Sequence, residues 1–174
     1  MDQEIDGLNA LLVGAKSGRA AVVDKLASAT TDLDRLSSTS TPWNALQCAV
    51  AHRHVAATEA LLRNGADPNL AMPAWSVAGT GTASGKRPLH LAAEVCCRRI
   101  ARLLLDAGAE VNAKDADGET ALTMVARRSF GHKLTELLVE RGADVSATTP
   151  AGRTPLELAR QNRLGRTVAV LERP

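Results

Sequence analysis

The stretch that decides the fold is RPLHLAA, residues 87–93, which is followed after a second apolar segment by GAEVN, residues 108–112. Both short sequences return along the chain. The counterparts of the first are NALQCAV (44–50), TALTMVA (120–126) and TPLELAR (154–160), and those of the second are GADPN (65–69) and GADVS (142–146). The shared leucines, Leu46, Leu89, Leu122 and Leu156, are spaced 43, 33 and 34 residues apart. A fixed period of about 33 residues predicts stacked structural repeats.

Each copy has the local signals of two helices joined by a turn. Thr120 and Thr154 stand where a side-chain oxygen caps a helix start, and Pro88 and Pro155 stand at the first helical position, where proline costs little. Apolar residues then recur at helical spacing. Gly65, Gly108 and Gly142 occupy positions where a helix C-cap requires a positive φ. No unit can bury its apolar face alone, so we expect the units to stack.

These motifs resemble the ankyrin repeat, whose signature is T-P-L-H-x-A. The resemblance covers nearly the whole chain in five copies, the first of them degenerate, with Leu11 as its leucine and TDLD (31–34) in place of GADVN. It implies an all-α ankyrin-repeat solenoid of helix-turn-helix units with short β-hairpin loops, forming a single domain over 1–174. The expected repeats are 8–38, 41–72, 85–114, 115–148 and 149–174, with a hairpin insertion at 70–86.

The copies depart from the family pattern at the starts of their first helices. Arg87 replaces the capping threonine, and Gln47, Thr123 and Glu157 replace histidine. We therefore expect His90 alone to make the inter-repeat bonds typical of the family's histidine. The first and last copies are polar on their outer sides and are expected to be caps.

The long gap between Leu46 and Leu89 contains GTGTASGKR, residues 79–87, which is similar to a phosphate-binding loop. The spacing excludes that motif, because Thr80 stands at its first glycine and Arg87 at its serine or threonine. About ten extra residues in a surface hairpin explain the gap, since lengthening a loop costs little entropy. Met72, Pro73, Trp75 and Val77 are apolar, and they either pack back on the scaffold or meet a partner.

Composition excludes several classes of function. The net charge of +2 is too small to indicate nucleic acid or membrane binding, and Cys48, Cys96 and Cys97 form neither a disulfide framework nor a zinc motif. The acidic start MDQEIDG is not a signal peptide, and no apolar run reaches the roughly 18 residues of a membrane span. We expect a cytoplasmic, monomeric protein without cofactor or metal.

Smaller clusters have ordinary interpretations. DADGET (115–120) lacks the spacing of a calcium loop and is expected to be a hairpin. His52 and His54 are not expected to share a metal, because side chains two apart on a helix point apart. Cys96 and Cys97 are expected to pack as thiols. Arg98, Arg99 and Arg102 are expected to form a solvated convex patch.

The resemblance also implies which residues face the concave groove. We expect partner binding there and on the long hairpin, by Trp43, His52, Trp75, Lys86, Glu94, Asp117, Glu119, Arg127, Arg128, Arg153 and Gln161. The implied function is a non-catalytic protein–protein interaction module, a scaffold or adaptor, whose partner has an acidic segment. The alternative is anion, nucleotide or nucleic-acid binding through the arginines, which the near absence of aromatic residues for base stacking disfavours. No catalytic constellation is present in the sequence, so an enzyme is not expected.

Overall fold

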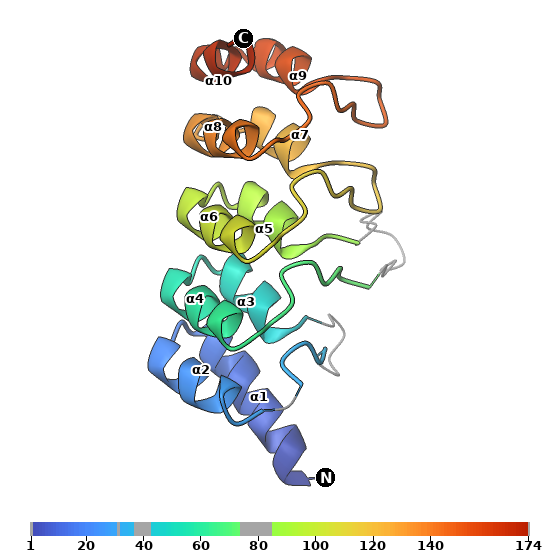
Figure 1. The fold of residues 1–174 in the computed structure, drawn as a ribbon. Coiled ribbons are helices and arrows are strands. Elements are labelled where there is room, and N and C mark those ends of the chain that lie inside the picture. The colour runs from blue at the N-terminus through green and yellow to red at the C-terminus, as the bar shows by residue number, and fades with distance from the viewer. Residues whose placement is uncertain (1, 31, 37–42, 74–84, 174) are drawn as a thin grey trace.

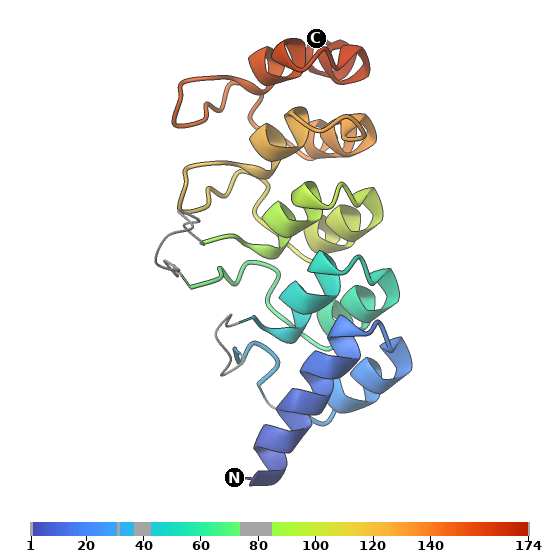
Figure 2. The same cartoon turned by 180° about the vertical axis from the view of Figure 1, so that it is seen from behind.

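A computed structural model describes residues 2–30, 32–36, 43–73 and 85–173. Over these residues the chain forms helix pairs stacked in one column, with the connecting hairpins projecting on one side (Figures 1 and 2). The helices are α1 (Asp2–Lys16), α2 (Ala20–Ala27), α3 (Ala45–Ala51), α4 (Val55–Arg63), α5 (Pro88–Glu94), α6 (Arg98–Asp106), α7 (Ala121–Ala126), α8 (His132–Glu140), α9 (Pro155–Gln161) and α10 (Gly165–Leu171). The all-α solenoid is confirmed, and the described residues contain one isolated β-bridge, between Lys114 and Thr120.

The helix starts follow the caps that the sequence predicts. Thr120 and Thr154 each accept a hydrogen bond from a backbone N–H one turn into α7 and α9. Pro88 and Pro155 begin α5 and α9. Arg87 has no acceptor in its side chain, so at α5 the cap consists of its own N–H donating to His90 Nδ1, at 3.0 Å.

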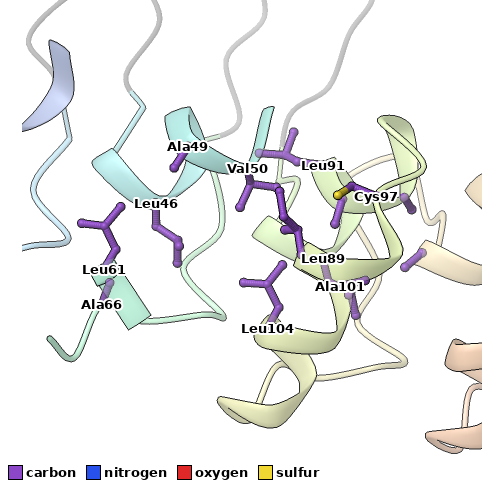
Figure 3. Packing of buried hydrophobic residues seen from close by; sticks show 14 of the residues in the cluster. Leu46, Ala49, Val50, Leu61, Ala66, Leu89, Leu91, Cys97, Ala101 and Leu104 are labelled. Atoms are coloured by element: carbon purple, nitrogen blue, oxygen red, sulfur yellow. The ribbon is translucent and has the colours of Figure 1, made fainter. Parts of the chain in front are cut away.

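One apolar core runs through the stack, from Leu11 in α1 to Ala143 after α8. Leu46, Leu89 and Leu122 lie in it with at most 3% of their surface exposed. Figure 3 shows the junction between α3–α4 and α5–α6, where alanines lie among the leucines and let neighbouring helices approach closely. The core is therefore continuous between repeats rather than confined to any one of them.

In the last repeat the leucine at this position, Leu156, is less buried than its counterparts. Leu156 is half-buried, whereas Leu158 and Ala159 of the same helix are buried. Within the described residues no further helix pair packs on the outer side of α9 and α10. Leu46, Leu89 and Leu122, by contrast, lie between two helix pairs of the described residues and are buried.

Polar side chains join successive repeats at corresponding positions. Asn69 accepts from Glu110 N at 2.8 Å and donates to Gly108 O, and Asn112 makes the same pair of bonds with Asp144 N and Gly142 O. Asp34 of the TDLD segment accepts from Asp67 N. The degenerate first copy is thus joined to the second by the same side-chain acceptor position.

The expectation that His90 alone makes the bonds typical of the family's histidine is wrong, because Gln47 makes a matching pair. His90 accepts from Arg87 N and bonds through Nε2 to Ala113 O at 3.0 Å. Gln47 accepts from Asn44 N through Oε1 and donates from Nε2 to Leu70 O at 3.1 Å. An amide has one acceptor and one donor group, as a neutral imidazole has. Glutamine can therefore make both of the bonds that histidine makes, one as an acceptor and one as a donor.

Three hairpins close by the same two backbone bonds. Met72 N donates to Lys86 O and Gly85 N to Met72 O, as Asp115 N does to Glu119 O and Gly118 N to Asp115 O; Thr149, Gly152 and Arg153 repeat the pattern. Gly85, Gly118 and Gly152 have φ values of 69°, 73° and 74°, which favour glycine. Between the closing residues the first hairpin has residues 73–84, and the others have only 116–117 and 150–151.

Candidate functional site

A cavity of about 310 Å³ lies where the hairpin 115–119 meets helices α5 and α7, and we call it the groove. Its lining is mostly charged, with four carboxylates and three cations. The lining residues are Lys86, Glu94, Asp115, Asp117, Glu119, Met124, Arg127, Arg128 and Pro150. Six of the predicted site residues are thus brought together at one place: Lys86, Glu94, Asp117, Glu119, Arg127 and Arg128.

Two ion pairs organise the groove. Lys86 Nζ lies 2.6 Å from Glu94 Oε1, and both side chains are half-buried. Arg127 lies 2.9 Å from Glu119 Oε2, and the same carboxylate oxygen accepts from Thr123 Oγ1 at 2.7 Å. Glu119 is 13% exposed, so this pair is better shielded from solvent than an ordinary surface pair. The groove therefore presents partly neutralised charges in fixed positions.

Asp115 shapes the groove's hairpin from within. Its Oδ1 accepts from Asp117 N and Glu119 N, at 3.0 and 2.9 Å, and the residue is buried. Asp117 itself is exposed near the tip. DADGET is therefore a hairpin turn, as predicted, and the described residues contain no group of three His, Cys, Asp or Glu suited to a metal.

Other predicted site residues lie elsewhere. Arg153 donates a hydrogen bond to Gln161 in the last repeat, and neither residue lines the groove. Trp43 is half-buried directly before α3 and takes part in an interaction of its own. Trp75 lies outside the described residues, as does most of GTGTASGKR. Of that stretch, Gly85 closes the hairpin, and Lys86 pairs with Glu94.

The argument that His52 and His54 point apart is wrong. Their rings are stacked, with centroids 6.1 Å apart and an interplanar angle of 7°. They do not share a helix face, because Arg53 between them has a φ of 61° and reverses the chain. His52 Nδ1 bonds to Cys48 O, and His54 Nε2 to Lys16 O. Each ring thus has a bond within the scaffold.

The convex arginine patch is also less uniform than expected. Arg99 and Arg102 are exposed, but Arg98 is half-buried, and its Nε has no hydrogen-bond partner among the described residues. Cys96 is half-buried and Cys97 buried, and both are free thiols. Burial raises the pKa of the Cys96 thiol, although Arg128 and Arg53 oppose that rise.

A second and larger cavity, of about 610 Å³, shares Glu94, Arg127 and Arg128 with the groove, and we call it the turn-side recess. Its lining includes the inter-helix turns of three repeats. The lining residues are Arg53, Glu94, Val95, Cys96, Arg127, Arg128, Ser129 and Phe130. Arg53 and Phe130 are not among the site residues that the repeat pattern predicts. The signal that could have found Phe130 is the interval from Leu122 to Leu156, which is one residue longer than that from Leu89 to Leu122.

Comparison with protein families identifies the architecture. The family described as ankyrin repeats (3 copies) matches residues 43–115 and 89–171, which together make up well over half of the chain. The chain belongs to the ankyrin-repeat family. Ankyrin repeats are in general protein–protein interaction modules, and the family is typically non-catalytic.

Comparison with curated proteins found no match. No helix among the described residues is both long and apolar enough to cross a membrane.

Proposed function

We propose that this protein is a non-catalytic scaffold or adaptor that binds a segment of a partner protein along the groove, with the long hairpin at 70–86 extending the contact surface. The observation that carries the proposal is the groove itself, where two neighbouring repeats and the hairpins beside them converge on one charged cavity. Concave sites with a few well-placed polar groups are typical binding sites. Trp43 and the arginines belong to the residue types that anchor interfaces.

The charges of the groove favour a peptide over a nucleic acid. Lys86 and Arg127 are each paired with a carboxylate, and Asp115 and Asp117 add two more carboxyl groups to the lining. A phosphate backbone would be repelled by these acids, whereas a peptide with both charged and amide groups can pair with either sign. Anion, nucleotide or nucleic-acid binding through the arginines remains the alternative.

The test is affinity capture from an extract of the source organism, with quantitative mass spectrometry of the bound proteins. The groove variant is Glu119→Ala with Arg127→Ala, which removes one ion pair without changing the net charge. The matched control is Asp106→Ala with Arg141→Ala, which removes a pair of 2.8 Å that joins α6 to the end of α8. Circular dichroism verifies that both variants are folded.

We expect a set of proteins that is captured by the wild type and the control and lost from the groove variant. A Trp75→Ala variant tests the long hairpin in the same experiment. If the groove variant captures the same set as the wild type, the groove is not the binding surface. Binding of single-stranded RNA that weakens steeply with salt would instead favour the alternative.

A further inference from the structure

The turn-side recess owes its shape to an unusually long turn. Five residues separate α7 from α8, whereas three separate the helices of every other pair in the described part of the chain. The longer turn carries Phe130, which is 86% exposed. Gly131 lies so close to α7 that a Cβ there would be 2.6 Å from Val125 O. The turn is thus folded tightly against the scaffold while the phenyl ring is directed outward.

Phe130 is the chain's one phenylalanine, and it is neither in the apolar core nor packed against it. Large apolar side chains are usually buried, and an exposed one beside a cavity is typical of an interaction site. Val95 and Cys96 line the same cavity and are half-buried. The recess therefore has an apolar side.

Cys96 and a further lining residue, Arg53, are held in a strained backbone conformation. Arg53 and Cys96 have φ values of 61° and 50°, in the left-handed region, where the first repeat has Gly18 at 71°. A non-glycine residue in this region costs roughly 1–2 kcal/mol. Arg163 has a φ of 56° at the same turn position of the last repeat, so the conformation belongs to the turn, and glycine should fit better at each of these positions.

The recess also carries uncompensated positive charge. Arg127 and Glu94 line it, but they are paired with Glu119 and Lys86. Arg53 and Arg128 form no ion pair within the described residues, and both are exposed. Arg53, Arg128 and Cys96 line the same cavity, so both guanidinium groups border one recess.

We propose that the turn-side recess binds a short segment of a partner protein in which a carboxylate stands next to an apolar side chain. The carboxylate lies between Arg53 and Arg128, where guanidinium groups can bind it with charge-assisted hydrogen bonds. The apolar side chain covers Phe130 and the wall formed by Val95 and Cys96. This inference deepens the proposed function, since it gives the chemistry of a partner segment beside the groove.

The observations favour an acidic–apolar peptide over a nucleic acid. One exposed phenylalanine offers a single stacking platform, whereas single-stranded nucleic acids are bound by successive aromatic residues. Glu94 stands in the lining between the two cavities and would repel a phosphate chain continuing into the groove. A carboxylate has a single charge and ends within the recess.

The test begins with a random heptapeptide library displayed on phage and selected on the wild-type protein. The most enriched peptide is synthesised with a fluorescent label, and its Kd is measured by fluorescence polarisation. The variants are Arg128→Gln and Phe130→Ser. Their matched controls are Arg102→Gln, on the exposed side of α6, and Val145→Ser, at a side chain that is 45% exposed.

We expect enriched peptides to contain Asp or Glu beside an apolar residue, and each recess variant to weaken binding about tenfold, as loss of a central interface contact does. The two controls should bind as the wild type does. Arg53→Gly provides a readout that a purely structural role would not produce, because it should raise the melting temperature and weaken peptide binding together. Replacing the acidic residue of the peptide by its amide should have the same effect as Arg128→Gln.

The proposal is overturned if no peptide is enriched, if enriched peptides lack an acidic residue, or if their binding is unchanged in Arg128→Gln and Phe130→Ser. Tighter binding of an oligouridylate than of any selected peptide would also overturn it. These outcomes are separate from failure of the proposed function. Phe130 and Arg53 line the recess and not the groove, whereas Arg128 lines both. If the groove variant loses its captured proteins while Phe130→Ser and Arg53→Gly keep them, the groove stands and the recess does not.

Discussion

The stacked helices α1–α10, which we call the layer, and the hairpins between repeats, which we call the edge, differ in how much variation in sequence and length they tolerate. In the layer, the same position is occupied by a buried leucine in three repeats: Leu46, Leu89 and Leu122. At the edge, three hairpins close with the same bonds although one contains residues 73–84 where the others have two residues. Residue type is constrained in the layer because the buried side chains contact the helix pairs on both sides. A hairpin is constrained only at the residues whose backbone bonds close it, so its length can vary.

The largest effect should come from the core. Leu122→Ala is expected to lower the free energy of unfolding by roughly 2–5 kcal/mol, because it removes a leucine that is 1% exposed from a packed core. Leu156→Ala should cost less, since Leu156 is half-buried in the last repeat. Urea unfolding followed by circular dichroism measures both. Equal losses at the two positions would mean that burial between repeats does not set the cost.

The next effect concerns the bonds between the layer and the edge. His90→Ala and Gln47→Ala should each cost about 1–3 kcal/mol, because each leaves backbone groups without their partners. The affected groups are Arg87 N and Ala113 O in the first case, and Asn44 N and Leu70 O in the second. The same unfolding experiment applies. A loss below that of an exposed control such as Arg102→Ala would show that these bonds contribute nothing.

His90→Gln should be nearly neutral at pH 7.5, because Gln47 makes the corresponding bonds in the preceding repeat. Burial lowers the pKa of His90, outweighing the bond to Ala113. His90 therefore takes up a proton more readily in the unfolded chain than in the folded protein. As a result, the wild type should lose stability as the pH falls below about 6.5, the ordinary pKa of histidine. The glutamine variant should lack this component.

The measurement for this variant is the difference in unfolding free energy between wild type and His90→Gln from pH 8 to pH 5. The difference should be constant at high pH and should shift in favour of the variant on acidification. Parallel curves across the range would contradict the assignment of a neutral His90 that accepts from Arg87 N.

The smallest effect is expected at the edge. Deleting 74–83 joins Pro73 to Ser84, so that Met72, Pro73, Ser84 and Gly85 can form a four-residue turn closed by the existing bond from Gly85 N to Met72 O. Proline suits the second position of such a turn. Stability should stay within about 1 kcal/mol of the wild type, because loop-closure entropy changes slowly with length. Loss of helical circular dichroism would show that the insertion supports the layer.

The sequence predicts the layer well because its determinants are local. Thr120, Thr154 and the prolines at Pro88 and Pro155 act on the helix that they begin, and the leucine spacing needs no knowledge of the neighbours. Gln47 was misjudged because a residue type was compared with the family's histidine, whereas the partners require one acceptor and one donor. The leucine spacing does not predict that Leu156 is half-buried while Leu46, Leu89 and Leu122 are buried.

The candidate site was only partly predictable. The groove position of Glu119 and Arg127 follows from the repeat pattern, but their mutual pairing depends on side-chain conformations that a pattern does not contain. The exposure of Phe130 depends on the extra length of one turn and on its close approach to α7. A difference of one residue in a repeat interval is easily taken for normal variation.

The bonds made by Gln47 and His90 also bear on how the chain folds during synthesis. Each side chain bonds to a carbonyl 23 residues later, in the segment that leads to the next repeat. Because the ribosome releases the N-terminus first, the Gln47 and His90 side chains lack these bonds until the next 23 residues have emerged, which is less than one repeat. Asn69 and Asn112 then bond to the GAEVN and GADVS segments of the following repeats, so the polar bonds of the array can form in the order in which it is translated.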